Sequence, residues 1–264
     1  MTADASRLLR DTRTISRREL DHWIAQPAPV IITLLFPVMT VLMFAYLFGG
    51  AITVPGGGSY REFLLPGMFA MTMLFGIETT LAAVVADLTR GITDRFRSLP
   101  MTSAAVVLGR ASADMLTAVA GLAVIAGCGL AVGWRPHRGA GLTLAAFGLL
   151  LLLRVAMTWL GIWLGLLVRT PEAVTSAQIL VWPLGFLSSA FVAPATMPGW
   201  LAAIAYWNPL SATVTATRQL FGNPVAAGPT WPAQHPVLLA IAWPLAITAV
   251  LLPLTARRYR GLSS

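Results

Sequence analysis

The sequence predicts an all-α polytopic membrane protein with six transmembrane helices, and two observations carry that prediction. The 264 residues are 57% hydrophobic and only 11% charged, whereas about a quarter of the residues in a soluble domain are charged. Six apolar segments also approach the roughly 20 residues that a helix needs to cross a bilayer. Little sequence is left over, so residues 1–264 are predicted to form a single transmembrane domain.

Residues 3–26 predict an amphipathic helix that lies in the membrane surface. On a helical wheel, five basic residues separate from five apolar ones, although Glu19 falls on the apolar side and weakens the pattern. The basic residues are Arg7, Arg10, Arg13, Arg17 and Arg18, and the apolar ones are Leu8, Leu9, Ile15, Leu20 and Trp23. Such a helix places its arginines among the lipid headgroups. Pro27 and Pro29 are expected to break it and turn the chain into the membrane.

Six membrane spans follow along the chain. They are predicted at residues 30–48, 63–86, 104–132, 142–168, 173–192 and 236–254. In the fourth span, Gly161 and Gly165 form a pair of small residues four apart, a spacing suited to close packing between helices. In the fifth span, Pro183 and Gly185 interrupt the apolar run.

The segment 91–101, between the second and third spans, is long enough for a short helix of its own. Thr93 is a plausible N-cap and Pro100 ends the segment. Phe96 and Leu99 are three residues apart and therefore share a helix face, flanked by Asp94, Arg95 and Arg97. One interpretation is a docking surface for another protein, and the other is a solvated basic loop.

Residues 193–235, between the fifth and sixth spans, are too apolar for an ordinary loop. They predict two short helices that dip into the membrane from outside without crossing it. The first begins at Pro198, near Trp200, and breaks at Asn208–Pro209. Ser211 is expected to cap the second helix, which ends near Phe221 at Gly222.

The arginines predict the orientation in the membrane. If the N-terminus is cytoplasmic, thirteen arginines fall inside and four outside, a strong positive-inside bias. The outside group is Arg61, Arg135, Arg138 and Arg218. The protein is therefore predicted to lie in the cell membrane, with both termini and residues 91–101 on the cytoplasmic side.

Three ionisable residues, Glu78, Asp114 and Arg154, lie inside predicted spans. Charge inside a membrane is costly and usually faces the interior of the helix bundle or water. Some of these residues could line a substrate path. Alternatively, a buried pair, such as Arg110–Asp114 or Glu78–Arg154, holds helices together.

The composition also excludes several kinds of chemistry. All eighteen basic residues are Arg, so the chain lacks the Lys of a P-loop ATPase. Cys128 is the only cysteine, and no metal-ligand or catalytic motif is present, so we expect no catalytic residue, bound metal or cofactor. The net charge of +8 is attributed to cytoplasmic loops and anionic lipid rather than to nucleic-acid binding.

Several of these features together resemble one family across essentially the whole chain. A basic surface helix precedes the first span, and Gly-Ile-Thr-Asp-Arg-Phe-Arg-Ser-Leu-Pro follows the second, at residues 91–100. The external region carries Met-Pro-Gly-Trp at 197–200, Asn-Pro at 208–209 and Arg218. This combination is similar to the permease subunit of type-2 ABC exporters, in particular the daunorubicin-resistance type that exports drugs or lipids.

The resemblance implies partners and roles. A second permease, identical or a close paralogue, would complete the pore, and two separate P-loop ATPase subunits would carry ATP and Mg. The coupling helix docking on the ATPase would use Gly91, Asp94, Arg95, Phe96, Arg97, Leu99 and Pro100. The helix at 3–26, with Arg10, Arg13, Arg17, Arg18 and Trp23, would also touch the ATPase. The external pair, with Pro198, Trp200, Asn208, Pro209 and Arg218, would cap a path for amphipathic drugs or lipids.

A second functional class remains open at this point. An ion-gradient-driven secondary transporter would use Glu78 and Asp114 as proton carriers, with Pro183 marking a broken helix. No inverted internal repeat is visible in the sequence, which favours the partner-driven exporter. A membrane scaffold without transport activity has no positive feature in its support.

Overall fold

The computed structural model describes residues 27–49, 52, 54, 57–89, 103–168, 171–226 and 228–261. The described part of the chain is helical and contains no strand. The predicted surface helix at 3–26 and the predicted coupling segment at 91–101 lie outside the described residues.

Four long helices form most of the bundle: α3 (Tyr60–Thr89), α5 (Ser103–Val132), α6 (Gly139–Leu167) and α11 (Pro236–Gly261). Each contains a stretch that is long and apolar enough to cross a membrane. They occupy the positions of the second, third, fourth and sixth predicted spans. Two further apolar helices, α2 (Pro27–Leu47) and α7 (Pro171–Phe186), occupy the positions of the first and fifth.

Helix α3 lies at the centre of the bundle, in contact with α2, α5, α6, α7 and α9. Its closest neighbour is α6, because Gly161 and Gly165 leave no side chain between the two helices. A Cβ atom added to Gly161 would lie 2.9 Å from Thr80 Cβ, and one added to Gly165 would lie 2.7 Å from Val84 Cβ. The predicted close packing at this glycine pair is therefore confirmed.

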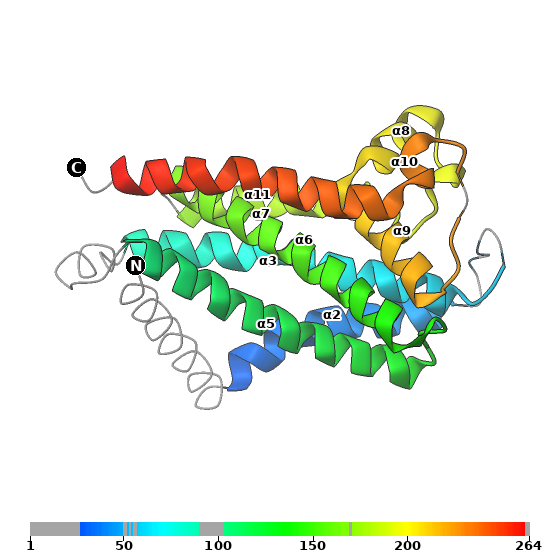
Figure 1. Ribbon diagram of the computed structural model, residues 1–264. Helices are drawn as coiled ribbons and strands as arrows, with labels where there is room; N and C mark the ends of the chain where they lie inside the picture. Colours follow the sequence, from blue (N-terminus) through cyan, green and yellow to red (C-terminus); the bar gives the residue numbers. More distant parts are fainter. Residues whose placement is uncertain are drawn as a thin grey trace.

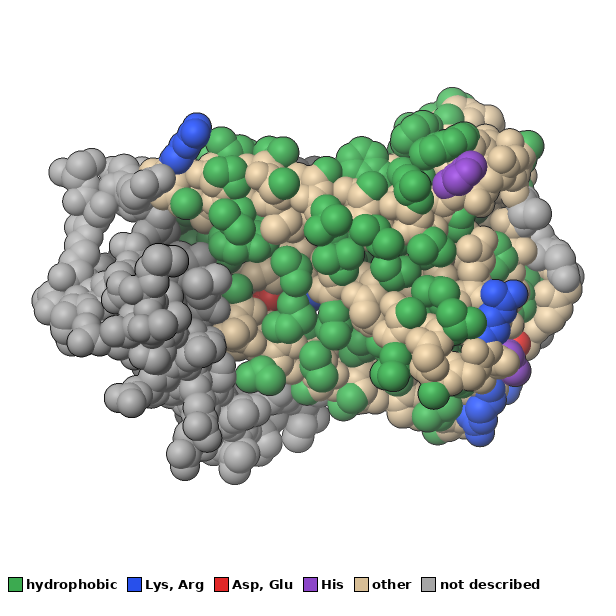
Figure 2. Space-filling model, in the orientation of Figure 1, with side chains coloured by type: hydrophobic (Ala, Val, Ile, Leu, Met, Phe, Trp, Pro, Cys, Tyr) green, Lys and Arg blue, Asp and Glu red, His purple; other side chains and the backbone are tan. Residues whose placement is uncertain are grey.

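The two ends of the bundle differ (Figure 1). At one end lie the end of α3, the start of α5 and the end of α11. At the other end lie η1 (Pro194–Thr196), α8 (Gly199–Trp207) and α10 (Trp231–Gln234), while α9 (Pro209–Phe221) packs against α3, α6 and α11. The face shown in Figure 2 is mostly apolar, and its arginines gather toward the two ends.

The fifth predicted span is shorter than expected. Residues 173–192 were expected to form one span, but α7 ends at Phe186, three residues after Pro183. The side-chain amide of Asn208 donates hydrogen bonds to the carbonyls of Leu184 (2.9 Å) and Leu187 (3.0 Å), so these carbonyls at the end of α7 have hydrogen-bond partners. A distant residue thus supplies a C-terminal cap that the local sequence does not indicate.

Asn208 also caps the start of α9, a role that was predicted for Ser211. Ser211 is not the cap; instead, Asn208 Oδ1 accepts a hydrogen bond from Leu210 N (2.9 Å), and Pro209 occupies the first helical position. The predicted end is confirmed, because Gly222 adopts a left-handed conformation (φ 76°) just after Phe221. Helices α8 and α9, with 9 and 13 residues, are both shorter than the roughly 20 residues of a membrane span.

Candidate functional site

A carboxylate–guanidinium pair lies inside the bundle, between α5 and α6. Arg154 Nε donates to Asp114 Oδ2 at 2.9 Å, and Arg154 Nη2 donates to Asp114 Oδ1. The two side chains are only 4% and 12% exposed. This two-point geometry is the strongest form of ion pair available to arginine, and it leaves the site with no net charge.

Two threonines complete the shell around the Asp114 carboxylate. Thr158 Oγ1, one turn after Arg154 on α6, donates to Oδ2, and Thr80 Oγ1 of α3 donates to Oδ1 at 3.2 Å. The carboxylate therefore accepts four hydrogen bonds, which come from two neighbouring helices. We call Thr80, Asp114, Arg154 and Thr158 the polar clamp, because together they join α3, α5 and α6.

Gly76 of α3 makes room for this clamp. A Cβ atom built on Gly76 would lie 1.1 Å from Arg154 Nη1, so any larger residue would displace the guanidinium. Sequence reasoning missed Gly76, Thr80 and Thr158. A signal was present, because Thr158 follows Arg154 by four residues and Gly76 precedes Thr80 by four, so each pair shares a helix face.

The structure changes the pairing expected from the sequence. The predicted Glu78–Arg154 ion pair is wrong, because the carboxylate that binds Arg154 is that of Asp114. The side chain of Arg110 lies outside the described residues, so the Arg110–Asp114 alternative stays a prediction. Glu78 is not part of the clamp, and its buried Oε1 atom has no hydrogen-bond partner in the described part of the chain.

A second polar site lies at the end of the bundle that carries α8 and α10. Arg218 of α9 is one of the four arginines predicted on the external side of the membrane, and its side chain is only 2% exposed. Its Nε donates to the Phe63 carbonyl (2.8 Å), its Nη2 donates to the Ala190 carbonyl (3.1 Å), and its Cζ lies 3.5 Å from the centre of the Phe63 ring. Burial lowers the pKa of Arg218 to about 9, while nearby Tyr60 acts to raise it, so the side chain is protonated at neutral pH.

The other residues predicted for the external helical pair lie on or beside α8 and at the start of α9. Pro198 precedes the first turn of α8, and Trp200 projects from that helix with 70% of its surface exposed. Asn208 and Pro209 form the junction between α8 and α9. The predicted ATPase-contacting residues at 91–101 and 3–26 lie outside the described residues and stay predictions.

Comparison with known proteins places the chain in a family. The ABC-2 type transporter family model matches residues 10–221. The chain is 35% identical over 236 residues to the daunorubicin resistance ABC transporter permease protein DrrB1 of Streptomyces coeruleorubidus, covering 89% of this chain and 81% of that protein.

More distant relatives have the same kind of description. A putative transport permease, ycf38, of Cyanophora paradoxa is 26% identical over 75% of this chain and 69% of its own length. The probable multidrug ABC transporter permease YbhR of Escherichia coli is 22% identical over 69% of this chain and 50% of its own length. With a family match over most of its length and apolar helices to span a membrane, the chain belongs to the ABC-2 type transporter family as a membrane permease.

Proposed function

We propose that this protein is the membrane-spanning permease of an ATP-driven exporter that moves amphipathic, drug-like or lipid molecules out of the cell. The observation that carries the proposal is the similarity to a daunorubicin resistance permease over 89% of the chain. The drug in that relative's name supports an amphipathic substrate class. The chain contains no Lys and therefore no P-loop, so ATP and Mg bind to a separate subunit.

Six spans are proposed, formed by α2, α3, α5, α6, α7 and α11. Four meet the length and hydropathy of a span, and α2 and α7 run beside α3 in the same bundle. The positive-inside bias supports a cell-membrane orientation with both termini cytoplasmic. The end of α3, the start of α5 and the end of α11 then face the cytoplasm, whereas α8 and α10 face outward.

Residues 91–101 are proposed to transmit the motion of the ATPase to the permease. They join the end of α3 to the start of α5, and Arg95 and Arg97 flank the predicted apolar face of Phe96 and Leu99. The surface helix at 3–26 would add a second contact. Closure of two ATPase subunits around ATP would move these segments and rock the permease against a second permease copy, opening a path between α2, α3 and α7.

The polar clamp suits this mechanism. It ties α5, which follows the coupling segment, to α3, which precedes it, and to α6. A displacement of residues 91–101 would therefore reach three helices as a unit rather than bending one of them.

The test uses the permease and its ATPase reconstituted in vesicles. Arg95→Glu with Arg97→Glu, or Phe96→Ala with Leu99→Ala, is expected to abolish ATP-dependent efflux and permease-stimulated ATP hydrolysis while membrane insertion is unchanged. Arg138→Glu, an exposed arginine at the opposite end of the bundle, is the matched control. Normal efflux and normal ATPase stimulation in the 91–101 variants would refute the coupling assignment. ATP hydrolysis by the purified permease alone would refute the separate ATPase.

A second candidate function, proton-driven transport, is favoured by one observation: Glu78 is half-buried, and its inaccessible Oε1 atom has no hydrogen-bond partner among the described residues. Asp114 does not share this feature, because its carboxylate is hydrogen-bonded to Arg154 and two threonines. If a proton gradient drives transport, Glu78→Gln stops efflux, and a proton ionophore abolishes efflux even when ATP is present. The ATP-driven proposal predicts instead that efflux survives the ionophore and requires ATP.

A further inference from the structure

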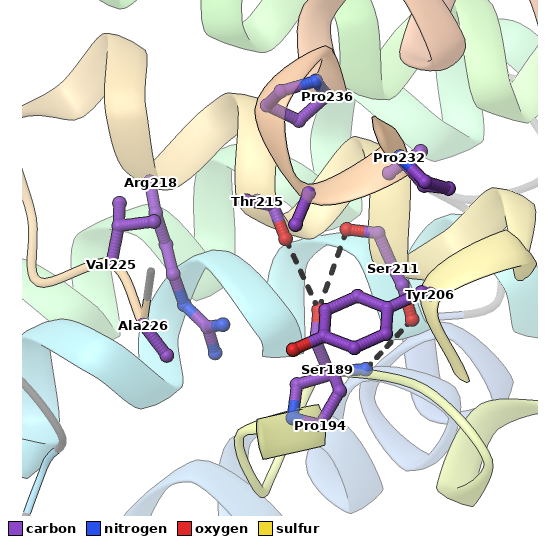
Figure 3. Close-up of a pocket in the computed structure, with 12 residues that line it drawn as sticks. Ser189, Pro194, Tyr206, Ser211, Thr215, Arg218, Val225, Ala226, Pro232 and Pro236 are labelled. Atoms are coloured by element: carbon purple, nitrogen blue, oxygen red, sulfur yellow. Dashed lines mark hydrogen bonds between the residues drawn. The ribbon is translucent and has the colours of Figure 1, made fainter. Parts of the chain in front are cut away.

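A small pocket lies beside Arg218, enclosed by α8, α9, α10 and the segments on either side of them (Figure 3). Its polar lining consists of Ser189, Tyr206, Ser211, Thr215 and Arg218, and the remaining lining is apolar. Ser211, Thr215 and Arg218 are spaced four and three residues apart on α9 and therefore share one face of that helix.

On one wall of the pocket, hydrogen bonds connect the serine and threonine residues and fix their hydroxyl groups. Ser189 Oγ donates to the Ser211 carbonyl (3.3 Å) and lies 3.4 Å from Thr215 Oγ1, while Ser189 N donates to Ser211 Oγ (2.9 Å). The Tyr206 ring lies across the pocket, with its hydroxyl on the side of Arg218. Gly228 leaves room for that hydroxyl, because a Cβ atom there would lie 2.7 Å from it.

The charge of Arg218 is not balanced by any acidic side chain that the structure describes. In the part of the chain that the structure describes, no carboxylate lies within ion-pair distance of it. Glu62, adjacent to its carbonyl partner Phe63, contacts His137 instead (Nε2–Oε1 2.8 Å). A guanidinium has five N–H donors, and two carbonyls and a ring supply only partial negative charge. A buried cation of this kind is stabilised by an anion that completes its hydrogen bonds.

The surroundings indicate where that anion comes from. The helices α8 and α10, which enclose the pocket, carry exposed tryptophans, the residue type enriched at the headgroup level of a membrane: Trp200, Trp207 and Trp231. Pro236, the first residue of α11, lines the pocket. On the opposite face of α11, Leu238, Ile241 and Leu245 are exposed apolar residues spaced three and four apart, as expected where a helix meets lipid.

We propose that this pocket binds the phosphate group of a membrane phospholipid. The Arg218 guanidinium supplies the counter-charge, and the Tyr206 and Thr215 hydroxyls donate hydrogen bonds to the phosphate oxygens. The lipid then acts as a fixed part of the α8–α10 region. This inference depends on the chain being a membrane permease and not on its source of energy.

The test measures lipid binding to the full-length permease, purified in a phosphorus-free detergent, delipidated and examined by native mass spectrometry and thermal unfolding. The probes are dioleoyl phosphatidylglycerol, dioleoylglycerol, which has the same chains and no phosphate, and inorganic phosphate. The wild-type protein is expected to bind phosphatidylglycerol at least tenfold more tightly than dioleoylglycerol. Tyr206→Phe with Thr215→Val is expected to weaken phosphatidylglycerol binding about a hundredfold, since it removes two hydrogen bonds to a charged group and each is worth about 1.5 kcal/mol, or about tenfold.

Two further variants keep the test decisive. Ala226 lines the pocket. Ala226→Phe puts a bulky side chain there while keeping Tyr206 and Thr215, and it is also expected to abolish the preference for phosphatidylglycerol. Thr117→Val, which removes an exposed hydroxyl bonded only within α5, is the matched control and should bind like the wild type. Equal binding of the two lipids by the wild type, or unchanged binding in both pocket variants, would overturn the proposal. Inorganic phosphate that binds as tightly as the lipid and displaces it would show a free-phosphate site and overturn the lipid assignment.

Discussion

The protein buries two arginines, Arg154 and Arg218, in two different ways. Arg154 lies inside the bundle, opposite the carboxylate of Asp114, with two threonines completing the shell. Arg218 lies near the α8–α10 end and binds two backbone carbonyls and the face of a phenylalanine. Both are almost inaccessible, at 4% and 2% exposure. The charge of Arg154 is neutralised by Asp114, whereas no carboxylate that the structure describes neutralises the charge of Arg218.

This difference fits the two roles. A neutral pair can be held between apolar helices because the field of each charge is cancelled at short range. It therefore serves as a tie between α3, α5 and α6. An unbalanced cation at the end of a bundle attracts an anion from the surroundings, so Arg218 is suited to holding a ligand. Four variants test the comparison, in order of decreasing effect.

The largest effect is expected from breaking the complete pair. Asp114→Ala should lower the free energy of unfolding by about 3–5 kcal/mol, because Arg154 is left as an unpaired buried charge. Asp114→Leu combined with Arg154→Met should recover most of this loss. Unfolding in mixed detergent micelles measures both. If the double variant is as unstable as the single one, the cost comes from packing and not from charge.

Removing Arg218 should cost less. Arg218→Met leaves no unpaired carboxylate, only the carbonyls of Phe63 and Ala190, so a loss of about 2–3 kcal/mol is expected in the same measurement. A loss larger than that of Asp114→Ala would contradict the distinction between the two sites and indicate that Arg218 is the main tie of its region.

Gly76→Ala tests the space behind the clamp. The new methyl group would occupy the position of Arg154 Nη1, so the pair must shift, at a cost of about 2 kcal/mol. Gly127→Ala is the matched control, since a Cβ atom there meets no atom within 4 Å. Equal effects of the two substitutions would show that helix flexibility, rather than Arg154, sets the cost.

The smallest effect is expected from Thr80→Val. It removes one of the four hydrogen bonds to Asp114 while Arg154 and Thr158 remain, so the expected loss is about 1 kcal/mol. The measurement is again the free energy of unfolding. In the Asp114→Leu, Arg154→Met background the same substitution should be close to neutral. A full effect in that background would assign Thr80 a packing role independent of the clamp.

Part of the fold could be predicted from the sequence, because the hydropathy of a segment depends only on the residues within that segment. An apolar stretch about 20 residues long is recognisable without knowledge of its neighbours. The helices at the predicted second, third, fourth and sixth spans follow from this, as does the end of α9 at Gly222. The glycine pair in α6 was also readable, since small residues four apart lie on one face of a helix.

The candidate sites were only partly accessible. The sequence marks Asp114 and Arg154 as costly charges, but their pairing spans 40 residues and depends on which helices become neighbours. Charge counting assigned Arg218 only to a side of the membrane; that its side chain is buried against the carbonyls of Phe63 and Ala190 could not be read from a count.

By itself, the sequence determined that the chain is a helical membrane protein without a P-loop, because composition and residue type need no partner to be read. Only the tertiary structure decided which charges meet and where helices end. Asn208 shows the reason: one side chain caps the start of α9 next to it and the end of α7 more than twenty residues earlier. Contacts between distant segments exist only after the helices have packed.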